Sequence, residues 1–321
     1  MAAIESSRIP QRRIGSTGPL TGVLAIGSWH TYDRMDFAET VGLIRAAVDA
    51  GVTLFDVGVY GIAGQQPVFT DVIFSAAVRA AGIARHDYQL SAKLWLEGYP
   101  QHSLRSQLEW AFLRAGVEHA DLAILGDLHG NELDLEQLVL DLGELVEAGL
   151  IRSWGVNNWS ASTIQILLDN AAKHRLAGPA IAQLKYSVAR RSIPDGEPFK
   201  AIFGQGVTLQ SSDVMEGGVL LGKAGREVGR DPGGVRDRII QSAAALRELA
   251  GQLGTQPSTL CIAFTLTHPA NTTTLFGATS IAQLRDNLGA IELVKQVGAA
   301  KLRELVAPLW ADRDAVDPEG P

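Results

Sequence analysis

The chain has 321 residues, 46% of them hydrophobic and 20% charged, with a formal net charge of −7. This length is enough for one large barrel or two small domains, and the negative charge without a basic stripe argues against a nucleic-acid partner. No uncharged apolar run is long enough for a membrane span, and residues 1–13 lack the apolar centre of a signal peptide. The single cysteine, Cys261, cannot form an internal disulfide and is expected to be a buried thiol. A reducing cytoplasm fits these features.

Short apolar segments alternate with segments of helical periodicity along most of the chain. Residues 8–20 contain two prolines and two glycines and predict a small hairpin or loop before the main fold. Strands are then expected at 22–27, 52–56, 88–95, 120–125, 151–156, 180–184, 207–210 and 272–276. Helices are expected at 36–50, 70–82, 103–115, 133–148, 160–173, 236–253, 257–268 and 280–293.

Several finer features follow from local residue chemistry. Thr70 and Ser160 stand where helix N-caps are expected. The pairs Arg12–Arg13 and Arg190–Arg191 are isolated and are expected to be solvated. The polar tail from about residue 311 is expected to fray.

Eight strand-then-helix units in about 280 residues predict a (β/α)8 TIM barrel, within the α/β class. The rival is a doubly wound open sheet, but no G-x-G-x-x-G segment joins an early strand to a helix. No composition shift marks a boundary. We therefore predict a single barrel domain over residues 1–321.

The segment at 51–61, GVTLFDVGVYG, combines a buried strand with charged and polar residues at its end. Asp56 stands where the strand should finish, and Tyr60 follows between two glycines. Chemistry in such barrels is located at the carboxyl ends of the strands. An unpaired buried charge is costly, so Lys93, near the end of the next apolar strand, is the natural partner of Asp56.

Seven short motifs occur in order at expected strand ends. They are Gly27-Ser28-Trp29, LFDVGVYG, LSAKLW, GVNNWS, the Gln183 to Tyr186 segment, GGVLLGK and GATSIAQLRDN. Together they resemble the aldo-keto reductase superfamily over nearly the whole chain. The resemblance implies a barrel with an N-terminal hairpin and a C-terminal helix, NADP (NADPH) as the usual cofactor, and hydride transfer to the carbonyl of a small molecule.

The resemblance also implies catalytic roles for Asp56, Tyr60 and Lys93. A reduced carbonyl oxygen needs a proton, which the tyrosine would supply. Because free tyrosine has a pKa of about 10, a neighbouring lysine eases proton loss. The aspartate would pair with the lysine, so that the cation is not buried alone.

Two catalytic positions depart from the family pattern. Tyr60 lies four residues after Asp56, where the family tyrosine lies five after its aspartate. Gly126 takes the position of the family histidine, and glycine offers no side-chain hydrogen bond. His129 follows three residues later and is either a replacement that reaches the pocket or a surface loop residue.

A third departure follows the seventh strand. Ser212 replaces the aromatic residue that stacks on the nicotinamide, and Asp213 places a carboxylate near the expected pyrophosphate. That carboxylate should turn away or pair with Lys223 or Arg226.

The resemblance assigns cofactor binding to residues along the whole barrel mouth. The nicotinamide carboxamide would be held by Asn157, Asn158 and Gln183. A 2′-phosphate would be bound by Lys223 with Arg226, Arg230 or Arg236, although these basic residues could equally be solvated. Asp286 and Asn287 could simply cap a helix or face water. Trp29, Trp95 and Trp159 would line a pocket or fill the barrel rim. The full set of proposed cofactor residues is Gly27, Ser28, Trp29, Asn157, Asn158, Gln183, Ser212, Lys223, Ser280, Gln283, Asp286 and Asn287.

Three functions remain open from the sequence. The first is an NADPH-dependent carbonyl reductase. The second is a non-redox dehydratase, isomerase or lyase on the same barrel, which would need no cofactor, because function resides in the site and not in the fold. The third is a cofactor-sensing regulatory protein, like the potassium-channel β subunits of the superfamily. The seven histidines lack metal-ligand spacing, so no metal site is expected.

Overall fold

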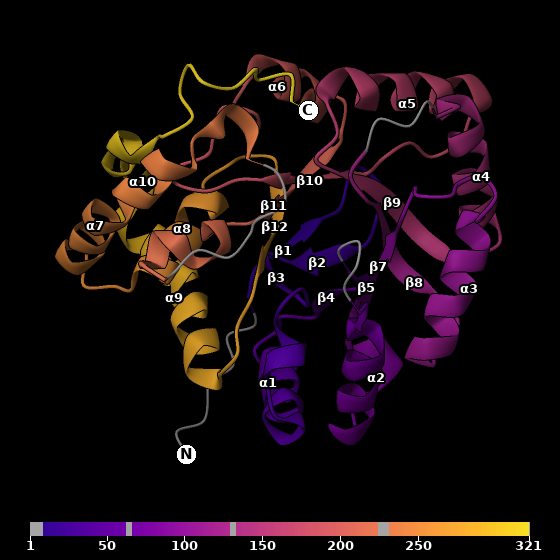
Figure 1. The fold of residues 1–321 in the computed structure, drawn as a ribbon, viewed down its shortest axis with the longest axis horizontal. Coiled ribbons are helices and arrows are strands. Elements are labelled where there is room, and N and C mark those ends of the chain that lie inside the picture. Colours follow the sequence, from indigo (N-terminus) through magenta and orange to yellow (C-terminus); the bar gives the residue numbers. More distant parts are fainter. Residues whose placement is uncertain (1–8, 62–65, 129–132, 224–230, 321) are drawn as a thin grey trace.

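The computed structural model describes residues 9–61, 66–128, 133–223 and 231–320. Eight parallel strands form a closed barrel in which the last strand pairs with the first (Figure 1). The strands, in order around the barrel, are β3 (Leu24–Gly27), β4 (Leu54–Val57), β7 (Gln89–Leu94), β8 (Ala120–Leu125), β9 (Ile151–Asn157), β10 (Ile181–Lys185), β11 (Thr208–Ser212) and β12 (Asn271–Phe276). The predicted (β/α)8 barrel is confirmed.

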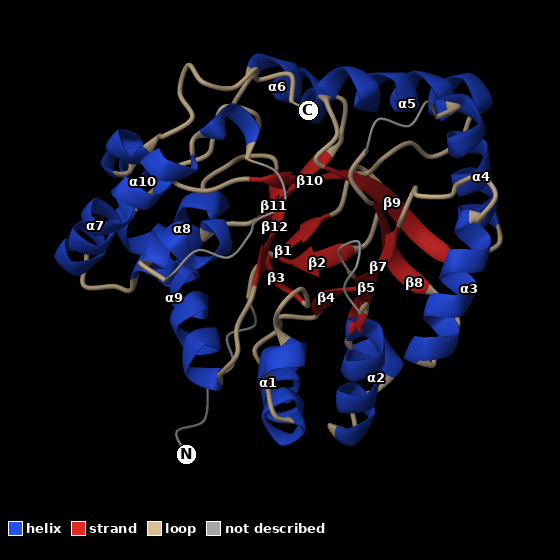
Figure 2. Cartoon of the chain, in the orientation of Figure 1, coloured by secondary structure: helices blue, strands red, loops and turns tan. Residues whose placement is uncertain are grey.

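Helices surround the barrel on every side (Figure 2). They are α1 (Phe37–Asp49), α2 (Thr70–Ala80), α3 (Leu104–Ala115), α4 (Leu135–Glu147), α5 (Ala161–His174), α6 (Glu197–Gly204), α7 (Arg236–Gln252), α8 (Pro257–Leu266), α9 (Ile281–Val297) and α10 (Ala299–Leu305). Short 3-10 turns lie at η1 (Tyr32–Arg34), η2 (Arg85–Asp87), η3 (Glu216–Leu221), η4 (Pro232–Gly234) and η5 (Ala307–Leu309).

Two helices, α6 and α10, were not predicted from the sequence. Each has eight or fewer residues, too short for helical periodicity to show. In α6 only Phe199 and Ile202 are buried. Tertiary packing, more than intrinsic propensity, stabilises helices of this length.

The N-terminal residues form the expected hairpin. Its strands, β1 (Gln11–Arg13) and β2 (Leu20–Gly22), pair antiparallel. Ile14, in the connection, packs with Leu122, Ile124 and Ile181 of the barrel strands. A second, smaller antiparallel pair joins β5 (Val59–Tyr60) to β6 (Val68–Phe69).

Of the two predicted helix N-caps, Ser160 and Thr70, one is confirmed and the other is wrong. Ser160 is the N-cap of α5, as predicted, and accepts a hydrogen bond from the Thr163 amide. The prediction for Thr70 is wrong, because the N-cap of α2 is Phe69. The Thr70 hydroxyl instead bonds to the Gly58 carbonyl at 2.7 Å and lies 2.7 Å from the Ser28 hydroxyl. It therefore ties together the loops that follow β3 and β4.

The expectations for Arg190–Arg191 and for the tail are also wrong. Arg190 and Arg191 are 2% and 3% exposed. Asp312, in the tail, is fully buried and accepts hydrogen bonds from the Arg191 amide and the Trp310 indole. Buried arginines persist when carboxylates and carbonyls satisfy them, and sequence spacing does not show such distant partners.

The single cysteine, Cys261, is buried in α8 as predicted. Among the described residues, no helix is both long enough and apolar enough to cross a membrane.

Candidate active site

Asp56 and Lys93 meet at the mouth of the barrel. Asp56 is 4% exposed and accepts a 2.8 Å hydrogen bond from the Ser91 hydroxyl. Lys93 Nζ lies 3.8 Å from Asp56 Oδ2, and both side chains are nearly buried. The expected ion pair is present, although 3.8 Å is too long for a hydrogen bond.

The shortest contact of Lys93 is with a different strand. Its Nζ donates to Gln183 Oε1 at 2.5 Å, and Gln183 Nε2 donates in turn to Gln210 Oε1 at 2.7 Å. Both ends of the Gln183 amide are thus engaged by protein groups. Gln210 was not among the residues predicted from the sequence, although a long polar side chain within a core strand is a visible signal.

Tyr60 lies between two tryptophans. Its ring is 6.4 Å from the Trp29 ring at 28°, and 6.1 Å from the Trp95 ring at 83°. Burial and the nearby Asp56 carboxylate raise the Tyr60 pKa well above its usual value, against a smaller lowering by a Ser28 hydrogen bond. Within the described part of the chain, no hydrogen bond links Tyr60 to Lys93.

The loop between these two residues depends on Gly58. A Cβ at Gly58 would lie 2.9 Å from Lys93 Cβ and 3.7 Å from Tyr60 Cζ. Only glycine lets the Tyr60 ring lie beside the base of the Lys93 side chain. The tyrosine and the lysine are therefore neighbours, although the ammonium is directed to Gln183.

A second tyrosine, missed in the sequence, lies near the same carboxylate. Tyr32 is 1% exposed, and its hydroxyl has no hydrogen-bond partner among the described residues. Burial, followed by Asp56, raises its pKa. Its ring is 6.3 Å from Phe74.

Gly126, at the expected histidine position, leaves space that another side chain fills. A Cβ on Gly126 would lie 2.6 Å from Trp95 Cε3, so the Trp95 indole occupies that volume. Trp95 Nε1 donates to the Val59 carbonyl at 3.1 Å. Trp159 is fully buried and donates to the Gly126 carbonyl, so it fills the rim. His129, the predicted substitute, lies outside the described residues.

The expected carboxamide donors, Asn157 and Asn158, converge on Asp127, which was not predicted at this place. Asn157 and Asn158 both donate their side-chain Nδ2 to Asp127 Oδ1, the latter at 3.2 Å. Asp127 follows directly after Gly126. The three residues thus form a polar cluster above β8 and β9, with a carboxylate where a carboxamide is expected.

Asp213 does turn to a lysine, but to a different one from those predicted. Lys185 Nζ lies 3.1 Å from Asp213 Oδ2. Ser212, in place of the stacking aromatic, accepts a hydrogen bond from the Tyr186 amide through its carbonyl. Lys185 lies at the end of β10, close to Asp213 in space and distant in sequence.

A buried ion-pair network anchors the segment after β11. Glu216 is fully buried and pairs with Arg190 at 3.3 Å, and Arg190 also pairs with Asp231 at 2.7 Å. Burial raises the Glu216 pKa, although Arg190 acts in the opposite direction. Glu216 and Asp231 are therefore held by the same arginine.

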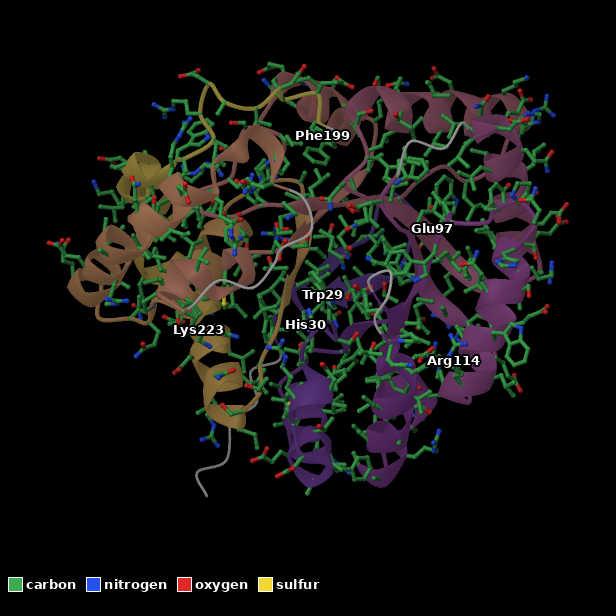
Figure 3. All side chains as sticks on the ribbon, in the orientation of Figure 1. Trp29, His30, Glu97, Arg114, Phe199 and Lys223 are labelled. Atoms are coloured by element: carbon green, nitrogen blue, oxygen red, sulfur yellow. The ribbon has the colours of Figure 1, made fainter. Side chains whose placement is uncertain are left out.

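The expected phosphate-binding residues are only partly visible. Lys223 is exposed, and in the view of Figure 3 its label lies apart from those of Trp29 and His30. Its side chain lies beside Gly218 of η3, because a Cβ there would be 3.5 Å from Lys223 Cδ. The Arg236 amide donates to Asp231. Arg226 and Arg230 lie outside the described residues.

The start of α9 carries the expected adenosine-binding residues together. Ser280 caps the helix by accepting from the Gln283 amide, and Gln283 Oε1 accepts from the Thr279 amide at 2.9 Å. Asn287 is 2% exposed, and its Oδ1 has no partner within the described residues. Asp286 is exposed.

The first loop of the barrel mouth combines buried and exposed residues. Ser28 is fully buried, whereas Trp29 is 40% exposed. A Cβ on Gly27 would meet no atom of the described residues within 4 Å. No cluster of three or more metal-ligating side chains is found in the described ranges.

The chain is similar to known proteins along most of its length. It is 23% identical to a "Putative voltage-gated potassium channel subunit beta" of Schizosaccharomyces pombe, covering 94% of this chain and 93% of that protein. It is 25% identical to a "Probable voltage-gated potassium channel subunit beta" of Oryza sativa subsp. japonica, covering 88% and 91%.

Solved structures share the fold. A thermostable aldo-keto reductase crystallised with the inhibitor epalrestat superposes with a TM-score of 0.73 at 22% identity, over 93% of this chain and 99% of that chain. The model of the aldo/keto reductase family matches residues 23–304. Because that match spans most of the sequence, and the barrel agrees with it, this chain belongs to the aldo/keto reductase family of oxidoreductases.

Proposed function

We propose that this protein is an NADPH-dependent oxidoreductase that reduces the carbonyl of a small molecule in the cytoplasm. The observation that supports this most directly is the Asp56–Lys93 ion pair, buried at the mouth of a barrel of this family. A buried ion pair is a weak contributor to stability. Its place beside Tyr60, at the carboxyl ends of the strands, is the usual place of catalysis in such barrels.

The adenosine end of the barrel mouth fits the cofactor that the family implies. The Asn287 side chain is buried, and its carbonyl oxygen lacks a protein partner in the described chain. Such an acceptor suits an amino group such as that of adenine. Lys223, exposed in the loop that follows η3, would hold a 2′-phosphate, which favours NADP over NAD.

The nicotinamide end contains side-chain amides, which can hydrogen-bond to the carboxamide of the cofactor. The carboxamide would take the amides of Asn157, Asn158 and Gln183 as partners. Asn157 and Asn158 are now bonded to Asp127, so they would have to exchange partners when a carboxamide arrives.

When bound, NADPH would supply a hydride to the carbonyl carbon. In the proposed reaction Tyr60 supplies the proton to the carbonyl oxygen. Its raised pKa keeps this proton in place at neutral pH, and the Lys93 ammonium stabilises the negative charge that forms when the proton leaves. The Asp56 carboxylate holds the charge of Lys93 near the site.

The aromatic side chains around Tyr60 indicate the kind of carbonyl compound. Trp29 and Trp95 flank the Tyr60 ring, and both would contact a substrate that reaches the hydroxyl. We propose an aldehyde or ketone with an apolar body, because aromatic walls favour apolar surface.

The experiment is a titration of the purified protein with NADPH, followed by tryptophan fluorescence and then by turnover with a panel of aldehydes and ketones. We expect saturable binding at micromolar concentration and NADPH oxidation with at least one carbonyl compound. An absence of binding at millimolar NADPH would contradict the proposal.

A second candidate function, non-redox acid–base catalysis, is favoured by the Asp127 cluster. A carboxylate now engages both asparagine amides, and Ser212 offers no stacking face. Asp56, Tyr60, Lys93 and His129 would then act as acids and bases without a cofactor. The third candidate, a cofactor-sensing regulatory protein, is favoured by the names of the channel-subunit relatives. It predicts NADPH binding without turnover.

A further inference from the structure

Four neighbouring strands carry polar residues in one row across the barrel. Asn157, Gln183 and Gln210 are register partners on β9, β10 and β11, and Gln210 pairs in register with Thr273 on β12. Lys93 reaches Gln183 although β7 and β10 are not neighbours in the barrel. Their side chains therefore meet inside the barrel, where branched apolar residues are usual.

The hydrogen bonds along this row have one direction. Lysine has only donors, so Gln183 must present its carbonyl oxygen to Lys93 and its NH2 group to Gln210. Gln210 must then present its own carbonyl oxygen to Gln183. The orientation of both amides is thus determined by the ammonium group at the start of the chain.

This arrangement leaves polar atoms without partners at its far end. Gln210 and Thr273 are fully buried, and Gln210 Nε2 and Thr273 Oγ1 have no hydrogen-bond partner among the described residues. An unpaired buried polar atom is unfavourable for folding. A long amide at position 210 is therefore hard to explain by stability, and a role in the site explains it better.

We propose that Gln210 is a positioning residue for Lys93. Its carbonyl oxygen fixes the Gln183 amide, so that Gln183 Oε1 faces the ammonium and keeps it at the barrel centre, near Asp56. Without this acceptor the Gln183 side chain is free to rotate, and Lys93 loses its shortest contact. The inference rests on the proposed function for its catalytic meaning, but the contact itself exists independently of turnover.

The competing explanation is an internal water molecule. A water between Gln210 and Thr273 would satisfy both unpartnered atoms, and the two residues would then have the same, purely structural role. The two explanations differ in whether Gln210 acts on Lys93 and Thr273 does not.

The test compares Gln210→Met with the matched control Thr273→Val. Each variant removes one unpartnered buried polar atom and keeps approximately the original volume, and Gln210→Met also removes the acceptor of Gln183 Nε2. Three quantities are measured: the melting temperature, the rate of reductive methylation of Lys93 by peptide mass spectrometry, and the pH profile of turnover with NADPH and a carbonyl substrate.

We expect Thr273→Val to melt at or above the wild-type temperature, and Gln210→Met at or below it, because Gln183 Nε2 loses its acceptor. Lys93 should be methylated faster only in Gln210→Met, by about three- to tenfold, because the amine is released from Gln183. The same variant should lower kcat by about tenfold and shift the pH profile. Gln210→Glu, which keeps an acceptor for Gln183, should return the methylation rate to within about twofold of wild type.

An unchanged Lys93 methylation rate in Gln210→Met would overturn the inference. Equal changes in Gln210→Met and Thr273→Val, or lower melting temperatures in both, would overturn it in favour of the internal water. Gln210→Leu replaces the methionine variant if the latter does not fold. If the wild-type protein turns over no carbonyl compound, the proposed function fails, while the methylation rates still decide the role of Gln210.

Discussion

The two ends of the proposed cofactor site are built in different ways. The adenosine end is formed within the first turns of one helix, α9, where Ser280, Gln283 and Asn287 are close in sequence. The hydride end is assembled from β4, β7, β8, β9 and β10. There the polar groups bond to one another: Lys93 to Gln183, and both asparagines to Asp127.

This difference shows which part is prepared for a ligand. The Asn287 carbonyl oxygen is buried without a partner in the described chain, so a ligand at this end gains a hydrogen bond without breaking one. At the hydride end, a bound carboxamide must displace existing bonds. Net binding is weaker when each new hydrogen bond replaces an old one, so we expect the adenosine end to provide most of the cofactor affinity.

The largest expected effect is that of Lys93→Met. Turnover should fall by about 10³-fold, because general acid catalysis loses its cation, and stability should fall by about 3–5 kcal/mol, because Asp56 is left buried without its partner. NADPH affinity should change little if the adenosine end dominates binding. Kinetics, chemical denaturation and fluorescence titration measure these three quantities.

The control for that variant is the double substitution Asp56→Asn with Lys93→Met. It removes both charges and should recover part of the lost stability while turnover stays low. If the double variant is as unstable as Lys93→Met, the pair contributes to stability through packing and not through charge balance.

The next effect is that of Tyr60→Phe, which removes the hydroxyl and keeps the ring between Trp29 and Trp95. Turnover should fall by about 10²-fold with unchanged NADPH affinity. Tyr32→Phe is the matched control, since it removes a hydroxyl near the same carboxylate. If Tyr60→Phe keeps full turnover, the proton comes from another group.

The same variant tests the raised Tyr60 pKa. Because the folded-state value lies above that of the unfolded chain, the proton stabilises the fold below about pH 10, and that stability is lost as the pH rises further. Wild-type stability should therefore decline above pH 10 more steeply than that of Tyr60→Phe, by up to about 1.4 kcal/mol per pH unit. Denaturation between pH 8 and pH 11 measures the difference; parallel curves would contradict it.

Gly126→Ala tests how closely the hydride end is packed. The new Cβ would meet Trp95 Cε3 at 2.6 Å, so we expect a loss of about 1–3 kcal/mol in the free energy of unfolding. Gly251→Ala is the control, because the residue lies in α7 and a Cβ there meets no described atom within 4 Å. A loss no larger than that of the control would show that the Trp95 indole moves freely.

The smallest effect is expected at the adenosine end. Asn287→Leu should weaken NADPH binding by about tenfold, or about 1.4 kcal/mol, without loss of stability, because it removes a buried oxygen that lacks a protein partner in the described structure. Lys295→Ala, at an exposed position in the last turn of the same helix, should change neither quantity. Unchanged NADPH affinity in Asn287→Leu would contradict the expectation that the adenosine end provides most of the affinity for the cofactor.

The sequence predicted the features that depend on local pattern. Strand and helix periodicity determined the barrel, the place of Asp56 at a strand end implied a buried cationic partner, and Ser160 was identified as an N-cap. Each of these follows from residues within one turn or one strand, where the periodicities of 2 and 3.6 hold. The short helices α6 and α10 offered too few residues for such a pattern.

Tertiary structure alone decided which polar atoms meet. Lys93 and Gln183 are 90 residues apart, Asp213 pairs with Lys185 and not with Lys223, and Trp95 fills the space beside Gly126. Arg190 pairs with the Glu216 carboxylate and the Arg191 guanidinium donates to the Val306 carbonyl, so partners from distant segments satisfy both buried side chains. Side-chain partners in a closed barrel depend on strand stagger and on three-dimensional packing, and neither quantity is contained in the local pattern of the sequence.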